Sequence, residues 1–282
     1  MTTTATKVQS ASSTAVKQKG SGVFVRPVEH RSKRTTERGV RGGAESFFAD
    51  AKPIFTAVRR SGAVLSKVKI QLIFWGSDWR KEKPPVADVE GKVRTLLASS
   101  YMDALKKNYS DIESGTLSPS ITFDKISLAD PPRHFRKDNI ENLIKSLING
   151  AALASSNDSQ MLYCVLMPRH TSSIEGDFFG EHSFVEVGGK RVHYAWLLND
   201  DDGKLDFITK VFSHELIESV SDPDGDGVVI VPDICHEGSW CEISDVCAGI
   251  DGVVGDIVVQ SYWSQKDKMC VIPGGVIAPK DL

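Results

Sequence analysis

The stretch LDFITKVFSHELIESV, residues 205–220, constrains the fold more than any other part of the chain. Apolar side chains recur at helical spacing from Leu205 to Leu216, which predicts a long helix with one face against a core. His214 and Glu218 are four residues apart, so they lie on one face of that helix. Apolar residues precede this pair on the same stripe. The pair therefore borders the core, where ionisable groups need partners.

The segments around this helix predict an α+β fold. Strands are predicted at 68–75, 118–128 and 160–168, with short ones near 228–231 and 256–260, and helices at 86–108 and 137–151. Two apolar runs on either side of Gly188 and Gly189 predict a hairpin. We expect a mixed sheet with helices and an irregular C-terminal lobe, in one domain from about residue 60 to residue 275.

Residues 1–50 differ from the rest in composition. The first 45 residues carry nine lysines and arginines against three glutamates, and they are rich in Ser and Thr. They have almost no apolar periodicity, which predicts a disordered basic tail. No run of seven apolar residues marks a secretory signal there, and no stretch in the chain is long enough to span a membrane. Because aromatic residues are not interleaved with the basic ones, we do not expect nucleic acid as a partner.

Four of the five cysteines fall within 36 residues near the C-terminus: Cys235, Cys241, Cys247 and Cys270. This clustering predicts one or two disulfides and favours a secreted or extracytoplasmic protein. Free thiols and a structural zinc site are the alternatives, although the spacings fit no common zinc pattern. Cys164 lies in an apolar run and is expected to be an inert core thiol.

His-Glu-x-x-Glu, residues 214–218, predicts a metal site. His214 and Glu218 are candidate ligands, and Glu215 is placed to act as a general base toward water. Two ligands are too few, and the stretch WCEISDVC offers Glu242 and Asp245 as further ligands. A mixed imidazole and carboxylate set suits Zn²⁺ and also Mn²⁺. The alternative is a solvated helix end without an ion.

The sequence DPDGDGVVIVPD follows the helix and predicts either a calcium loop or a plain turn. The candidate Ca²⁺ ligands are Asp222, Asp224, Asp226 and Asp233. Oxygen ligands at alternate positions around a glycine are typical of calcium loops. Asp-Pro and Asp-Gly pairs equally favour a turn. The region 200–256 holds fifteen acidic residues and two lysines, an excess that solvent or bound cations must neutralise.

His182 and His193 lie on the predicted hairpin. His182 is interpreted first as a structural histidine. His182 is also considered as an extra ligand or as a group that polarises a substrate.

Two family resemblances rest on these motifs. HELIESVSD is similar to the active-site helix of thermolysin-like, or gluzincin, metalloproteases, and EISDV is similar to their downstream helix. This resemblance implies that His214 and Glu242 are ligands, that Glu215 is the base and that Asp245 supports a ligand. The chain departs from that family because Glu218 replaces the second His, and because Glu242 and Asp245 are three residues apart where the family has four.

A wider resemblance covers residues 68–272. The motifs IFWGSDW, HYAWLL, SHELIESVSDP, EISDVC and VVQSYWS occur in the order typical of the phosphate-induced, or EXORDIUM-like, proteins. In that family His-Glu-x-x-Glu is the usual form of the helix, so Glu218 fits it. The resemblance implies a secreted protein linked to growth and cell-wall signalling, with no settled biochemical activity.

The sequence therefore predicts a zincin-like, metal-dependent hydrolase, with a peptide or protein as its substrate. The alternative is a non-catalytic secreted or surface module in which zinc or calcium stabilises the irregular lobe. The sequence leaves the oligomeric state open.

Overall fold

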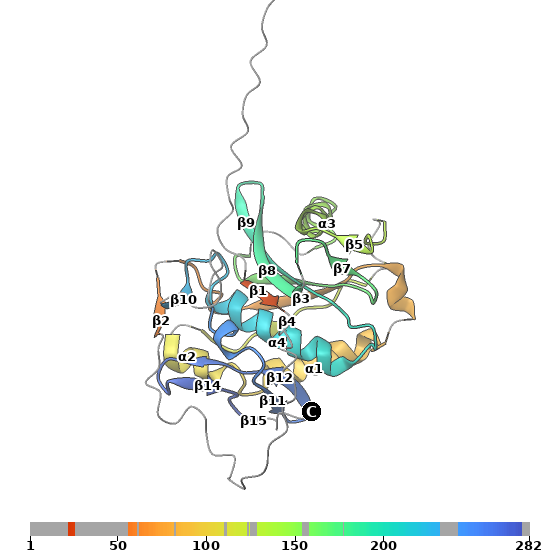
Figure 1. The fold of residues 1–282 in the computed structure, drawn as a ribbon. Helices are drawn as coiled ribbons and strands as arrows, with labels where there is room; N and C mark the ends of the chain where they lie inside the picture. Colours follow the sequence, from red (N-terminus) through yellow and green to blue (C-terminus); the bar gives the residue numbers. More distant parts are fainter. Residues whose placement is uncertain are drawn as a thin grey trace, which may run out of the picture.

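The computed structural model describes residues 22–25, 56–60, 62–81, 83–109, 112–122, 124, 129–153, 158–176, 178–231 and 242–277. Its main sheet has the strand order β1-β8-β9-β6-β3-β4 (Figure 1). The bounds are β1 Gly22–Val25, β8 Phe178–Val187, β9 Lys190–Leu197, β6 Met161–Leu166, β3 Lys69–Phe74 and β4 Thr116–Leu117. The pairs from β9 to β4 are parallel, while β8 and β1 run antiparallel to their neighbours. The α+β class is thus confirmed.

The other elements, in chain order, are β2 Thr56–Arg59, η1 Ser77–Arg80, α1 Val86–Ala98, α2 Asp103–Tyr109, β5 His134–Phe135, α3 Lys137–Asn149, β7 Ser172–Ser173, α4 Leu205–Ser221, β10 Val228–Val231, η3 Asp245–Cys247, β11 Asp251–Val254, β12 Ile257–Gln260, β13 Tyr262–Ser264, β14 Met269–Val271 and β15 Val276–Ile277.

Alternation along the central strands divides the core into two layers. In β3, Ile70, Leu72 and Phe74 pack with α1 and α4, while Ile73 faces the other layer with α3. Residues of β6 and β9 alternate in the same way. The sheet therefore lies between α3 on one face and α1 and α4 on the other (Figure 1).

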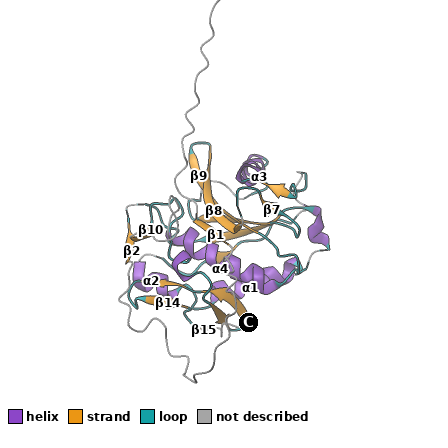
Figure 2. Cartoon of the chain, in the orientation of Figure 1, coloured by secondary structure: helices purple, strands orange, loops and turns teal. Residues whose placement is uncertain are grey.

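The C-terminal lobe packs on the side of α4 away from the sheet (Figure 2). It consists of the three-stranded sheet β12-β11-β15 and the pair β13-β14. A disulfide joins Cys247 at the end of η3 to Cys270 in β14. This confirms the predicted disulfide for these two cysteines, while Cys235 and Cys241 lie outside the described residues.

Two expected elements differ from the structure. The helix predicted at 86–108 is interrupted at Ser99, whose hydroxyl donates to the Leu96 carbonyl (2.6 Å) and accepts from the Tyr101 amide (3.1 Å). Such local hydrogen bonds compete with helix formation. Of the strand predicted at 118–128, the described residues form only one bridge to β3, at Ile121, while β4 lies just before this range; residues 123 and 125–128 lie outside the described residues.

The disordered tail stays a prediction. Within it, Gly22–Val25 forms the edge strand β1 beside β8, while residues 1–21 and 26–55 lie outside the described residues. Across the described ranges, no helix has both the length and the apolar character that crossing a bilayer requires.

Candidate metal centre

Helix α4 places the first two candidate ligands side by side. The helix begins after Lys204, whose backbone amide donates to the Asp200 carboxylate (2.8 Å), and it ends at Asp222. His214 Nε2 lies 3.1 Å from Glu218 Oε2, as their four-residue spacing predicts. Both side chains are fully buried, so the predicted border position is in fact an interior one.

Strand β8 brings His182 to the same place. Gly180 and His182 alternate with Glu181, so they face α4 while Glu181 faces α3 and its Lys137 (2.7 Å). His182 Nδ1 lies 3.5 Å from Glu215 Oε2 and 3.8 Å from Glu218 Oε2. His182 therefore lies among the candidate ligands, although the sequence favoured a structural role for it. The signal in the sequence is the alternation itself, because it puts this histidine on the helix-covered face.

The segment Glu242–Asp245 supplies the remaining carboxylates. Glu242 Oε1 lies 3.4 Å from His182 Nε2, and Asp245 Oδ1 lies 3.8 Å from His214 Nε2. The ligand atoms thus form two groups, His182–Glu218–Glu242 and His214–Glu218–Asp245, each with all its atoms within 4.8 Å of one another. The sequence predicted a joint set of His214, Glu218 and Glu242. The structure instead brings Glu242 to His182, and Glu218 belongs to both groups.

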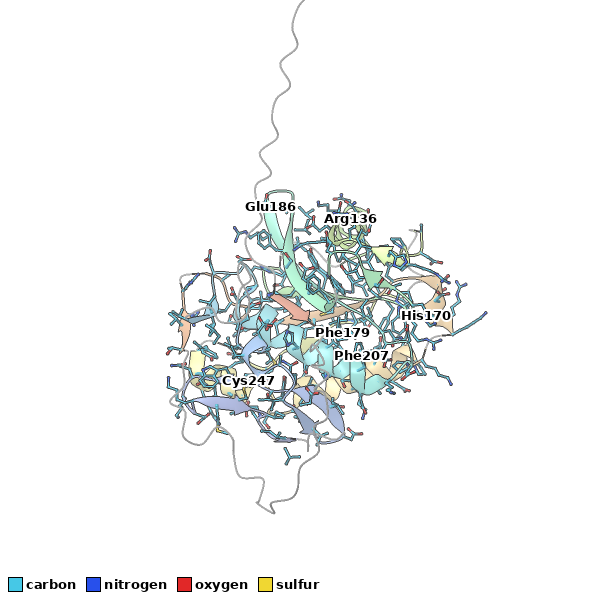
Figure 3. All side chains as sticks on the ribbon, in the orientation of Figure 1. Arg136, His170, Phe179, Glu186, Phe207 and Cys247 are labelled. Atoms are coloured by element: carbon cyan, nitrogen blue, oxygen red, sulfur yellow. A yellow bond between two sulfur atoms is a disulfide. The ribbon has the colours of Figure 1, made fainter. Side chains whose placement is uncertain are left out.

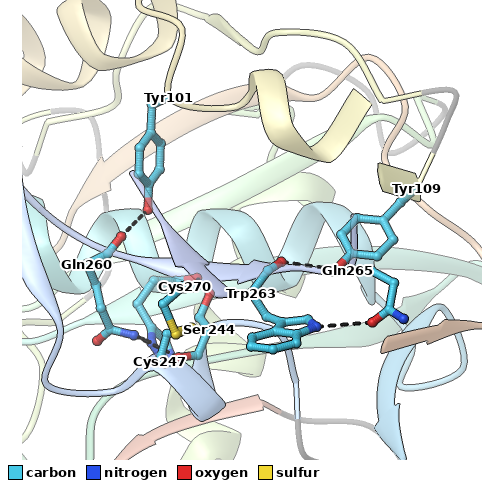
Figure 4. Close-up of a disulfide and its surroundings, with 9 residues drawn as sticks. Tyr101, Tyr109, Ser244, Cys247, Gln260, Trp263, Gln265 and Cys270 are labelled. Atoms are coloured by element: carbon cyan, nitrogen blue, oxygen red, sulfur yellow. Dashed lines mark hydrogen bonds between the residues drawn. A yellow bond between two sulfur atoms is a disulfide. The ribbon is translucent and has the colours of Figure 1, made fainter. Parts of the chain in front are cut away.

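Gln260, at the end of β12, is a site residue that the sequence analysis did not identify. Its Nε2 lies 2.8 Å from His214 Nδ1 and donates to the Ser244 carbonyl (3.0 Å; Figure 4). In this orientation Nδ1 accepts a hydrogen bond, so the proton of a neutral His214 is on Nε2 and faces Glu218. Binding a cation at Nε2 requires this proton to move to Nδ1. Turning the amide by 180° would provide Oε1 as its acceptor, at the cost of the bond to Ser244.

Burial dominates the ionisation of these groups. It lowers the pKa of His182 to about 3 and that of His214 to about 4, so both imidazoles are neutral at neutral pH. Burial also raises the pKa of Glu218 well above its usual value, and the backbone amides of Asp245 and Ser244 only partly offset this effect. The pKa of Glu242 is raised by burial and then by the neighbouring carboxylates, of which Glu218 has the largest effect. Neutral imidazoles beside crowded carboxylates are what a divalent cation would neutralise.

The buried carboxylates also lack hydrogen bonds. Neither oxygen of Glu242 has a hydrogen-bond partner among the residues that the structure describes, and the Glu218 carboxylate is approached by the backbone amides of Asp245 and Ser244 without good hydrogen-bond geometry. Buried polar groups with so few partners are rare in folded proteins, and a bound ion would provide them. This observation fits a cation at the site.

Glu215 packs tightly between α4 and β8. A Cβ added at Gly180 would lie 2.7 Å from Glu215 Oε1 and 2.9 Å from Val211 Cγ1, so only glycine allows this approach. The candidate base is thus held next to His182 and Glu218, on the strand-facing side of the helix.

The Asp-rich loop does not gather its carboxylates around one point. Asp222 Oδ1 accepts from the Gly227 amide (2.6 Å), Asp224 pairs with Arg191 (2.6 Å) and His193 (2.9 Å), and the exposed Asp226 faces Arg60 (3.9 Å). Asp233 lies outside the described residues. The contacts of the three described aspartates are those of a turn, and the calcium hypothesis gains no support from them. His193 is paired with Asp224 and lies in neither group of candidate ligands.

Comparison with known proteins yields no relative: no family model, no curated protein and no solved structure matches the chain. The zincin-like and EXORDIUM-like resemblances therefore stay predictions, and the functional argument depends on the site.

Proposed function

We propose that this protein is a metal-dependent hydrolase that acts on peptides. The observation that carries the proposal is the gathering of His182, His214, Glu218, Glu242 and Asp245 into two adjacent groups that share Glu218, with Glu215 beside them. The histidines come from β8 and α4, and the carboxylates come from α4 and from the segment Glu242–Asp245, which leads into η3. A plain helix end would not require ionisable groups from three parts of the chain.

The side chains divide into ligands and a base. A Zn²⁺ or Mn²⁺ ion held by these residues would supply Lewis acidity and make water a better nucleophile. Glu215 would accept a proton from the attacking water at a carboxylate oxygen and would return it to the leaving amine. Because several ligands are anionic, the ion is a weaker Lewis acid than one held by histidines alone, and we expect slow turnover.

A peptide substrate is favoured by the sheet edge beside the site. Strand β1 occupies this edge, pairing antiparallel with β8 with Gly22 opposite His182 and Phe24 opposite Gly180, so an extended peptide substrate would bind there in place of β1. Peptides commonly bind by adding a strand to a sheet.

A cavity of about 320 Å³ opens further along the line between α4 and β8, with Phe178, Phe179 and Phe207 in its wall (Figure 3). Phe207 precedes Glu215 by eight residues, or about 12 Å along the helix. A side chain of the peptide substrate, a few residues from the cleaved bond, would therefore reach the cavity.

Burial favours a second candidate function, a non-catalytic module with a structural ion. His214, Glu215, Glu218 and Glu242 are each at most 1% exposed. A catalytic ion needs an open position for water, whereas a structural one does not. In both cases the disulfide supports a protein that matures in an oxidising compartment.

The variant Glu215→Gln separates the two candidates. We expect it to keep the metal content of the parent protein and to lose cleavage of a peptide library by at least 100-fold, because only the base is removed. Metal is measured by elemental mass spectrometry after gel filtration, and cleavage by mass spectrometry of the library.

The control is Glu186→Gln, an exposed glutamate on the same strand as His182, which should change neither quantity. Bound metal without any cleavage in the parent protein would reject the hydrolase and leave the structural module. Absence of metal in the parent protein would reject both.

A further inference from the structure

The two groups of ligand atoms meet at a single residue. Glu218 Oε2 lies 3.1 Å from His214 Nε2 and 3.8 Å from His182 Nδ1. The other members do not mix: Glu242 is grouped with His182, and Asp245 with His214. Each group offers one imidazole and two carboxylates, so each by itself is a plausible set of ligands for one cation.

The hydrogen bonds of His182 indicate a cation on its own side of Glu218. Its Nε2 lies 3.2 Å from the Asp222 carbonyl oxygen, which can only accept, so the proton of a neutral His182 is on Nε2. The lone pair on Nδ1 then points toward Glu215 and Glu218, and Nδ1 has no hydrogen-bond partner among the described residues. A lone pair that faces two carboxylates in a buried site is repulsive unless a proton or a cation lies between them, and this is therefore a place where a cation can replace a proton.

The site gathers more carboxyl groups than one divalent ion would balance if all of them were ionised. Five carboxyl groups, those of Glu215, Glu218, Asp222, Glu242 and Asp245, lie close together, and all but that of Asp245 are buried. Lys137 and Lys210 lie near the histidines, but they are paired with Glu181 (2.7 Å) and Asp251 (2.8 Å). One divalent cation would balance two of the five carboxylates, and two cations would balance four.

We propose that the site holds two divalent cations, one bound by His182, Glu218 and Glu242 and the other by His214, Glu218 and Asp245, with the Glu218 carboxylate as the bridge. This inference rests on the proposed metal site and adds the number of ions that the site holds. Paired ions about 3.5–4 Å apart are typical of hydrolytic sites that stabilise both the attacking and the leaving atom. In such a pair Glu215, which lies beside His182, would act as the base next to the first ion.

The test uses the full chain and Mn²⁺ alone as the probe. Metal is removed with a chelator, Mn²⁺ is added in excess, unbound ion is removed by gel filtration, and bound ion is counted by elemental mass spectrometry. We expect two Mn²⁺ per chain and an electron paramagnetic resonance spectrum of an exchange-coupled pair, because a bridging carboxylate couples the two spins.

The variants assign the two ions. His182→Asn and Asp245→Asn should each retain one ion, with the spectrum of an isolated Mn²⁺, while Glu218→Gln should lose the coupling and weaken both sites at least tenfold. Glu186→Gln is the control and should bind two ions. The count on the unaltered chain needs no variant, so the test stands even where a substitution impairs folding.

Each outcome is decisive. One ion per chain would overturn the paired site and leave the proposed function intact. Two ions without coupling would overturn the bridge, and no bound ion would overturn both this inference and the proposed function.

Discussion

At the scale of single residues, burial lowers the pKa of the histidines of the site and raises the pKa of its carboxyl groups. It keeps His182 and His214 neutral and therefore ready to bind a cation, with pKa values of about 3 and about 4. It also makes the charged forms of Glu218, Glu242 and Asp222 costly when no cation is present. The metal-free protein must therefore hold protons where the loaded protein holds ions, and metal uptake should release protons.

Asp222 provides a test of this cost. Burial, followed by the repulsion of Asp226 and Asp224, raises its pKa from 3.8 to about 7. The unfolded chain then loses this proton first, so the free energy of unfolding contributed by Asp222 falls as pH rises from about 4 to about 7. Asp222→Asn keeps an acceptor for the Gly227 amide and cannot ionise. We expect this variant to gain stability relative to the metal-free parent over that range, by at most about 4 kcal/mol.

The measurement is urea unfolding of both proteins at a series of pH values, after metal removal. The difference between the two proteins isolates Asp222 from the histidines, whose lowered pKa values give the opposite slope below pH 6.5. A difference that stays constant with pH would show that Asp222 ionises normally in the folded protein.

The sequence allowed only part of the site to be predicted. His214 and Glu218 follow from helical geometry, because their spacing alone puts them on one face. The division of Glu242 and Asp245 between two histidines depends on the path of the segment before η3, which no local pattern encodes. Gln260 could not be identified either, because a single glutamine at the end of a short strand carries no signal until α4 is packed against it.

At the scale of elements, the contact between α4 and β8 determines the position of the candidate base. Gly180 lets the strand approach Glu215 and Val211, and the pleat turns His182 toward the helix. The site therefore depends on how closely one strand packs against one helix.

Gly180→Ala should disturb this contact. The added methyl group would lie 2.7 Å from Glu215 Oε1, so either the side chain or the strand must move. We expect a loss of about 1–3 kcal/mol in the free energy of unfolding and a fall in peptide cleavage larger than the fall in bound metal.

The matched control is Gly91→Ala in α1, where an added Cβ meets nothing within 4 Å and should stabilise the helix by about 0.5–1 kcal/mol. Unfolding curves and metal counts for both variants provide the comparison. Unchanged stability and cleavage in Gly180→Ala would show that the close contact between Gly180 and Glu215 contributes to neither.

At the scale of the whole molecule, the disulfide holds the carboxylates of the C-terminal lobe against α4. Cys247 ends η3 and is two residues from Asp245, while Cys270 belongs to the β13-β14 pair (Figure 4). The bond spans 23 residues of chain, for which loop-closure entropy predicts a stabilisation of about 3 kcal/mol.

Replacing both cysteines with alanine should lower stability by about that amount and should weaken Mn²⁺ binding, because Glu242 and Asp245 lose their anchor. Mn²⁺ affinity is measured by titration of the folded protein at low temperature. Cys164→Ala, which removes a buried free thiol from β6, should lower stability and leave affinity unchanged. Equal affinity in the two variants would show that the disulfide has no part in the site.

The main elements of the fold could be read from the sequence because their patterns are long and regular. The apolar run of β6, the hairpin around Gly188 and Gly189, and α4 all match their predicted positions. The helix prediction for 86–108 failed where one side chain decides the outcome, at Ser99. The attachment of β1 to β8 was missed because four residues in a polar segment give too little periodicity to detect.

The alternation in β8 has a consequence for how sequences of this kind can diverge. One residue inserted just before His182 would turn it toward α3 and bring a neighbour to the helix face, whereas two residues would restore the original facing. Gly188 and Gly189 turn the hairpin with φ of 58° and 75°, and nothing lies within 4 Å of a Cβ added at either, so residues inserted at the tip meet no neighbour as long as the turn keeps its glycines. We therefore expect gaps in an alignment of related chains to gather at the tip, and insertions of odd length to be absent between Gly180 and Val185.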